Sequence, residues 1–137
     1  MKPRILFLCT YNSCRSQMAE GLVNHYLGDR FQAFSAGLEA TRVNLLAFRV
    51  LAQLGIDITS QYSKTIAAFE GQQFDLVISL CSPADANFPD TFGGVRIVHI
   101  VFDDPSRLTG TDKELMPKFQ QLRDEMRQRL TDYLTAE

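Results

Sequence analysis

Short apolar runs alternate along this chain with longer stretches whose apolar residues recur every three or four positions. The short runs predict buried β-strands at Arg4–Cys9, Ala33–Ser35, Leu76–Leu80 and Ile97–Val101. The longer stretches predict amphipathic helices over Gln17–Leu27, over Leu45–Leu54, and from Lys113 or Leu115 to Leu134. Gly55 follows the second helix directly and is a typical helix stop.

Strands that alternate with helices predict a doubly wound α/β fold. We expect a four-stranded parallel sheet with helices on both faces, in a flavodoxin-like three-layer arrangement. In such sheets, ligands bind beyond the carboxyl ends of the strands. Cys9, Cys81 and the pair Asp103-Asp104 all follow predicted strands, so we expect these three segments to meet at one edge of the sheet.

The composition is that of an ordinary globular protein, and a single domain over residues 1–137 is expected. Hydrophobic residues make up 45% of the chain and charged residues 22%, with a net charge of −2. This balance predicts no affinity for nucleic acid or for a membrane surface. The sequence has neither a signal-peptide pattern nor a long apolar run, so a cytoplasmic location is expected. Three cysteines suit a reducing compartment.

The segment Cys9-Thr-Tyr-Asn-Ser-Cys-Arg15-Ser16 forms the predicted turn between the first strand and the first helix. A turn of this kind directs backbone N–H groups and the positive end of the helix at its centre, where a tetrahedral oxyanion fits. The same environment favours the thiolate form of a cysteine. Cys9 is therefore a candidate nucleophile, and the candidate anion-binding residues are Thr10, Tyr11, Asn12, Ser13, Cys14, Arg15 and Ser16.

Arg15 stands in the first helical turn, which is the unfavourable end of the helix dipole for a cation. Functional positions often break a local rule of this kind. A guanidinium there would hold two oxygens of phosphate or arsenate in bidentate fashion. The simpler interpretation makes Cys9 a buried apolar residue and Arg15 a solvated surface residue. A Walker loop is excluded, because its lysine and flanking glycines are absent.

The chain resembles the cysteine arsenate reductases that share the low-molecular-weight protein tyrosine phosphatase fold. The residues that carry the resemblance lie in Cys9–Gly21, Ser35–Glu39, Gly55–Ile58, Ser79–Ser82 and Asp103–Pro105. Phosphatases of this fold usually have proline where Gln17 stands and an aromatic residue where Ser106 stands, so both differences favour the reductases. Tyr11 stands where relatives often have glycine. A left-handed backbone at Tyr11 would be costly, so we expect an altered loop with Tyr11 at its rim.

The resemblance implies a catalytic set made of Cys9, Arg15, Asp104 and Cys81. Cys9 would attack arsenate, Asp104 would act as general acid, and Cys81 would attack the Cys9–arsenic adduct to release arsenite. An external thiol, either thioredoxin or glutaredoxin with glutathione, would then restore both cysteines. By the residues alone, Asp104 before Pro105 is equally a turn initiator, and Cys81 is equally a small buried residue at a strand end.

Thioredoxin-coupled relatives have a further cysteine seven residues after the position of Cys81, where this chain has Phe88. A relay of three thiols within the chain is therefore not expected here. Cys14 is the rival partner for Cys9, since phosphatases of this fold form a protective disulfide between the matching positions. If Cys81 plays no part, a small thiol such as glutathione would attack the adduct itself.

Some relatives bind potassium beneath the anion loop at positions that match Asn12, Glu20, Ser35 and Lys64. The residue at the position of Lys64 is often acidic in those relatives, so potassium activation is doubtful here and Lys64 would serve as a built-in cation. Ordinary polar support of the turn explains these residues equally well. Ser16 either donates a hydrogen bond to the Cys9 thiolate or caps the helix. No tightly bound cofactor or metal is expected.

Two other functions compete with arsenate reduction. A low-molecular-weight phosphatase would hydrolyse a Cys9 phospho-intermediate with water. A non-catalytic binding module would keep the fold alone, and the intact Cys9, Arg15 and Asp104 argue against it. The feature that separates reductase from phosphatase is a second thiol within reach of Cys9.

Overall fold

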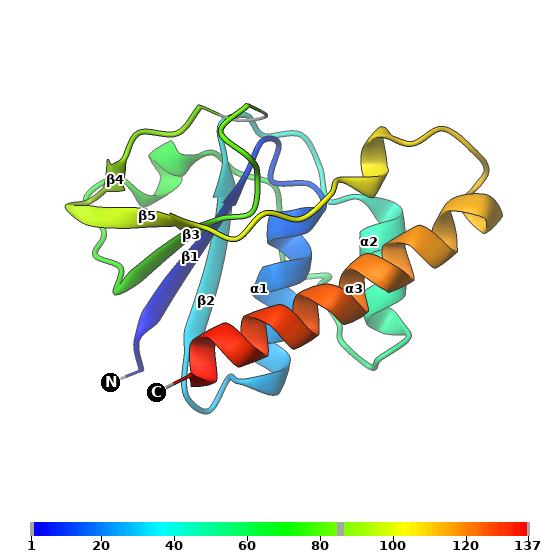
Figure 1. Cartoon of the computed structure of the whole chain (residues 1–137), viewed down its shortest axis with the longest axis horizontal. Coiled ribbons are helices and arrows are strands. Elements are labelled where there is room, and N and C mark those ends of the chain that lie inside the picture. Colours follow the sequence, from blue (N-terminus) through cyan, green and yellow to red (C-terminus); the bar gives the residue numbers. More distant parts are fainter. Residues whose placement is uncertain (1, 85–86, 137) are drawn as a thin grey trace.

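The structure is a computed structural model that describes residues 2–84 and 87–136 (Figure 1). Its strands are β1 (Arg4–Cys9), β2 (Gln32–Gly37), β3 (Leu76–Ser79), β4 (Thr91–Phe92) and β5 (Val95–His99). Its α-helices are α1 (Arg15–Tyr26), α2 (Leu45–Ala52) and α3 (Asp112–Thr135). Two short 3₁₀ helices, η1 (Ile66–Phe69) and η2 (Pro105–Arg107), lie in the connections.

The strands form one sheet in the order β2-β1-β3-β5-β4, which confirms the predicted α/β class. The first four strands of that order are parallel, as predicted, and β4 is an additional antiparallel edge strand. This fifth strand arises because Gly93 and Gly94 both adopt positive φ angles, 58° and 81°, and join β4 to β5 in a tight hairpin. The edge strand extends the predicted four-stranded sheet without changing its topology.

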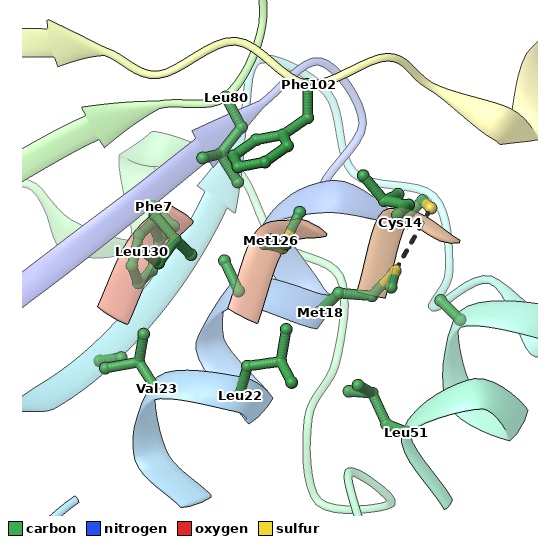
Figure 2. Close-up of a cluster of buried hydrophobic side chains, with 14 of the residues drawn as sticks. Phe7, Cys14, Met18, Leu22, Val23, Leu51, Leu80, Phe102, Met126 and Leu130 are labelled. Carbon is green, nitrogen blue, oxygen red and sulfur yellow. Dashed lines mark hydrogen bonds between the residues drawn. The ribbon is translucent and has the colours of Figure 1, made fainter. Parts of the chain in front are cut away.

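Successive residues of β1 point to opposite faces of the sheet and therefore enter two separate cores. Ile5 and Phe7 face the side on which α1, α2 and α3 all pack. Figure 2 shows Phe7 on this side among Leu22, Met126 and Leu130. Leu6 and Leu8 face the other side, which is covered by η1 and by a group of edge-to-face aromatic rings. The sequence predicts helices on both faces, but all three α-helices lie on one face, and the 3₁₀ helix η1 is the helix that covers the other. Between α2 and β3 the chain forms only that short turn of helix, and in the described residues β3 is followed by the edge strand β4.

Helix α3 begins at Asp112, one residue before the earlier of the two predicted starts, Lys113 and Leu115. Thr111 and Glu114 form a capping box, because each side chain bonds the backbone N–H of the other. Arg123 and Arg129 tie the helix to the rest of the molecule through the carbonyl oxygens of Val50 and Val101. Across residues 2–84 and 87–136, no helix is long and apolar enough to cross a membrane.

Candidate active site

The turn between β1 and α1 lies where the carboxyl ends of the parallel strands meet, at the top of the sheet in Figure 1. Its one described non-glycine residue with positive φ is Asn12, at 49°. Asparagine tolerates this conformation. Tyr11 itself does not adopt a positive φ, so the cost of a left-handed backbone at this residue does not arise, and Tyr11 is 46% exposed at the rim of the turn. Tyr11 at the rim matches the prediction, whereas the bend itself falls on Asn12.

Arg15 is 2% exposed, so the interpretation of this residue as a solvated surface side chain is wrong. Its guanidinium donates to the backbone oxygen of Phe102 at 3.1 Å and to Asp104 Oδ2 at 3.4 Å. The other carboxylate oxygen of Asp104 accepts from the N–H and the hydroxyl of Ser106, at 3.0 and 2.5 Å. Asp104 therefore caps η2 and pairs with Arg15 at the same time. Asp104 thus starts a turn and also lies beside Arg15, so the two interpretations of this residue are compatible.

The hydroxyl of Ser16 lies 2.8 Å from Cys9 Sγ, and Cys14 rather than Ser16 is the N-cap of α1. The capping alternative for Ser16 is thus wrong. Asn12 Oδ1 accepts from the backbone N–H of Lys64 and from Gln17 Nε2, both at 2.9 Å, so the amide group of Asn12 must face Ser16. Asn12 Nδ2 donates to Ser16 Oγ at 2.8 Å. Ser16 Oγ thus accepts from Asn12, and its hydroxyl proton is free to point at the sulfur of Cys9 when Cys9 is a thiolate.

Gln17 is completely buried and holds the far side of the turn. Its amide nitrogen donates to Asn12 and to the backbone oxygen of Tyr62, and its oxygen accepts from Gln61 Nε2 at 2.8 Å. The donors form one directed series, from Gln61 through Gln17 and Asn12 to Ser16 and Cys9. The departure from proline at position 17 therefore supplies a buried anchor for the loop.

Cys81 is fully buried and packs directly against Cys9. Burial raises the pKa of the Cys81 thiol above its ordinary value of 9.0, while the charge of Arg15 and a contact with Thr10 oppose that shift. The Thr10 hydroxyl lies 3.6 Å from Cys81 Sγ. A second thiol is thus within reach of Cys9, and it is held in its protonated form at neutral pH.

Cys14 lies on the opposite side of the turn, in the helical core. Its thiol contacts Met18 Sδ at 3.9 Å, as the dashed line in Figure 2 shows. Burial raises the pKa of Cys14 well above 9.0, and the charges of Asp104 and Cys9 raise it further. All three cysteines are free thiols. Cys14 lines the same small cavity as Cys9, whereas Cys81 packs with Cys9 in a separate buried pair.

Glu20, Ser35 and Lys64 meet beneath the turn. Ser35 donates to Glu20 Oε1 at 2.6 Å, and Lys64 Nζ lies 3.9 Å from the same oxygen. Lys64 also donates to the carbonyl of Tyr62 at 3.1 Å. Burial raises the pKa of Glu20 and lowers that of Lys64, so desolvation outweighs their attraction. The four residues predicted to surround a cation are thus together, with an ammonium among them.

The centre of the turn is nearly closed. The cavity bounded by Cys9, Arg15 and Asp104 has a volume of about 10 Å³, which is space for about one water molecule. Asp104 lies on Arg15, at the position where an oxyanion would be held. A tetrahedral anion therefore needs Asp104 and the rim to move outward.

Comparisons with known proteins bear on this site. The sequence profile of the low molecular weight phosphotyrosine protein phosphatase family matches residues 4–136. This chain belongs to that family. The arsenate reductase of Halalkalibacterium halodurans is 46% identical over 132 residues, covering 96% of this chain and 95% of the relative. The arsenate reductase of Bacillus subtilis is 45% identical over 129 residues, covering 94% and 93%. An arsenate reductase solved in its phosphate binding state superposes with a TM-score of 0.80, at 32% identity, covering 97% of this chain and 96% of the other.

The structure brings together the four residues predicted to be catalytic. Cys9, Arg15 and Asp104 line one small cavity, and Cys81 packs with Cys9. Asp103 does not join them through any described side-chain bond. No group of three or more metal-ligating residues occurs in the described part of the chain.

Two groups that support the site have no signal of their own in the sequence: the side chain of Gln61, which donates to Gln17, and the backbone oxygen of Phe102, which accepts from Arg15. Gln61 lies 44 positions from Gln17 and Phe102 lies 87 positions from Arg15, so only the folded chain brings these pairs together. The glutamine at position 17, where phosphatases of this fold usually have proline, is the sequence feature that points to this hydrogen-bonded support.

Proposed function

We propose that this chain is an arsenate reductase in which Cys9 and Cys81 supply the two electrons. The observation that carries the proposal is the direct packing of Cys81 on Cys9 at the anion loop. The similarity to arsenate reductases over nearly the whole chain supports the same activity.

In the first step, arsenate binds in the turn and replaces Asp104 as the partner of Arg15. The guanidinium and the loop N–H groups hold its oxygens. Ser16 stabilises the Cys9 thiolate, whose sulfur attacks arsenic. An S–As bond forms and an As–O bond breaks, and the departing oxygen takes a proton from Asp104 and leaves as water.

In the second step, the sulfur of Cys81 attacks the sulfur of Cys9. The S–S bond forms while the S–As bond breaks, and its electron pair stays on arsenic, which passes from arsenic(V) to arsenic(III). Cys81 is protonated at the start, since burial raises its pKa. Its proton passes to an oxygen of the departing arsenite. Two external thiol groups then reduce the Cys9–Cys81 disulfide.

The external reductant is a thiol, either thioredoxin or glutaredoxin with glutathione. The two cysteines of the oxidised pair are neighbours in space. Position 88 holds phenylalanine, so it offers no third cysteine that could exchange with this disulfide and expose it to the reductant. The reductant must therefore attack the Cys9–Cys81 pair itself. This requirement fits a cytoplasmic location, where such thiols are maintained.

Lys64 takes the place of a bound cation in the support of the loop. Its ammonium lies among the carboxylate of Glu20, the carbonyl of Tyr62 and the rings of Tyr62 and Phe69, at 4.8 and 5.8 Å from the ring centroids. Its own backbone N–H holds Asn12. We therefore expect arsenate reduction to be unchanged when potassium is replaced by sodium at constant ionic strength.

A phosphatase activity of the same loop is the alternative function, and the family assignment favours testing it. The decisive experiment is one turnover with arsenate and no reductant, followed by arsenite measurement and peptide mapping. Arsenite equal to enzyme with a Cys9–Cys81 link is the expected result. Cys81→Ser should form no such link, whereas Cys14→Ser should behave as wild type. Three free thiols together with steady hydrolysis of an aryl phosphate would overturn the proposal.

A further inference from the structure

The side chain of Phe88 packs against the buried pair formed by Cys9 and Cys81. Cys81 is 0% exposed and Cys9 is 3% exposed, whereas Phe88 is partly exposed. Phe88 therefore forms part of the cover over this buried pair. Phe88 also contacts the apolar group around Leu6 and Leu8 on the same face of the sheet, so its position over the thiols is held by the core.

This placement matters for the last step of the cycle. A thiolate attacks a disulfide in line with the S–S bond, so one sulfur must be open from the side opposite its partner. Attack at Cys81 expels Cys9, whose sulfur lies 2.8 Å from the hydroxyl of Ser16 and lines the same small cavity as Arg15. Attack at Cys9 would instead expel Cys81 into a site that disfavours its charged form. Cys81 is thus the better target, and it is fully buried.

We infer that Phe88 is a specificity-determining residue for the thiol that regenerates this enzyme. The inference rests on the proposed disulfide between Cys9 and Cys81. The ring excludes free small thiols from Cys81, and a reductant succeeds when its own surface displaces the ring. In the reaction, the attacking thiolate forms a mixed disulfide with Cys81 and Cys9 leaves as a thiolate. A second thiol of the reductant then releases Cys81 and takes the oxidised state away with it.

The chain offers a matched control. Phe92 contacts the same apolar group around Leu6 and Leu8 but does not pack on the thiols. Phe92→Ala removes the same side chain from that face and leaves the cover over Cys81 in place. Phe88→Leu retains an apolar cover of smaller size.

The test uses protein oxidised with a diamide reagent to the Cys9–Cys81 disulfide and then treated with glutathione. Release of thiols should be at least tenfold faster in Phe88→Ala than in wild type, with Phe92→Ala at the wild-type rate and Phe88→Leu between them. With thioredoxin as reductant, Phe88→Ala should gain less than threefold. Equal glutathione rates for wild type, Phe88→Ala and Phe92→Ala would overturn the inference.

A second measurement separates this inference from the proposed function. Reduced protein is alkylated with iodoacetamide and the labelling of Cys81 is followed by peptide mapping. Faster labelling of Cys81 in Phe88→Ala than in Phe92→Ala is expected even if arsenate turnover yields no disulfide. If arsenate does yield the Cys9–Cys81 link but the two variants label equally, the shield is refuted and the proposed function stands.

Discussion

At the scale of single residues, the direction of the Ser16 hydroxyl is set from outside the loop. Two donors on Asn12 Oδ1 turn its amide group toward Ser16, and that amide leaves the hydroxyl proton of Ser16 to Cys9. A positive backbone φ at Asn12 brings its side chain under the turn. The loop therefore fixes both the place of the sulfur and the donor that stabilises its charge.

We predict that Ser16→Ala slows arsenate reduction at pH 7 by roughly 10- to 100-fold, because a hydrogen bond to a charged group contributes about 1.5–3 kcal/mol. Alkylation of Cys9 by iodoacetate, followed by peptide mapping, should slow in parallel. Ser35→Ala is a matched control, because it removes a hydroxyl beneath the same turn that contacts Glu20 rather than Cys9. Equal Cys9 alkylation rates in Ser16→Ala and wild type would refute the donor role of Ser16.

The ion pair between Glu20 and Lys64 predicts a pH dependence of stability. Burial raises the pKa of Glu20 above 4.5, so the folded state binds more protons than the unfolded state between 4.5 and the raised pKa. Unfolding free energy therefore falls as pH rises through that window. The Glu20→Gln variant has no carboxyl group at this position, so its unfolding free energy does not fall for this reason, and its amide oxygen can still accept from Ser35. In urea titrations at increasing pH from 5 upward, the stability of wild type minus that of Glu20→Gln should first fall and then level off above the raised pKa of Glu20. A difference that rises with pH would contradict the expectation.

At the scale of elements, the end of β2 is packed tightly behind the anion loop. A Cβ atom on Gly37 would lie 2.7 Å from the backbone nitrogen of Asn12 and 2.9 Å from the carbonyl oxygen of Thr10. The carbonyl of Thr10 accepts from the N–H groups of Leu38 and Glu39. Strand β2 thus fixes the backbone of the loop, and only glycine permits this close approach.

Gly37→Ala should push the loop out of place and reduce kcat/KM for arsenate by tenfold or more. Gly71→Ala provides the control. Gly71 has a φ of 82° and open space around it, so alanine there costs about 1–2 kcal/mol of stability through backbone strain without touching the loop. Measuring kcat/KM and urea unfolding for both variants separates the two effects. Wild-type kcat/KM in a folded Gly37→Ala protein would show that the loop does not depend on β2.

The apolar pattern predicts these elements well because burial decides them. The first strand is predicted without error, and α1 and α2 are predicted to within two residues at each end. The edge strand β4 is missed because two residues carry no periodic signal, although Gly93-Gly94 is a turn pattern. The site residues that follow strands are found because parallel strands share one carboxyl edge. Gln61 and the Phe102 carbonyl are missed because their partners are distant in sequence.

At the scale of the whole molecule, the candidate site is formed by the segments that follow β1, β3 and β5. The chain beyond β5 follows the end of β3, since the N–H groups of Ile100 and Phe102 donate to the carbonyls of Ser79 and Leu80. This pairing carries Asp104 over the turn to Arg15. A carboxylate of the protein is therefore the partner of the guanidinium that we propose to hold the substrate anion.

We predict that Asp104 opposes anion binding but assists turnover, and a substitution of Asp104 separates the two effects. Asp104→Ala should bind phosphate several-fold more tightly, because Arg15 is freed and a negative charge is removed, while arsenate reduction falls by roughly 10²- to 10⁴-fold through loss of the general acid. Phosphate binding is measured by calorimetry and by the rise in Tm, since a ligand at ten times its Kd stabilises by about 1.4 kcal/mol. Arg15→Lys should lose both binding and turnover, because an ammonium cannot replace the planar fork. Weaker phosphate binding by a folded Asp104→Ala protein would mean that the carboxylate supports the anion site and does not compete for Arg15.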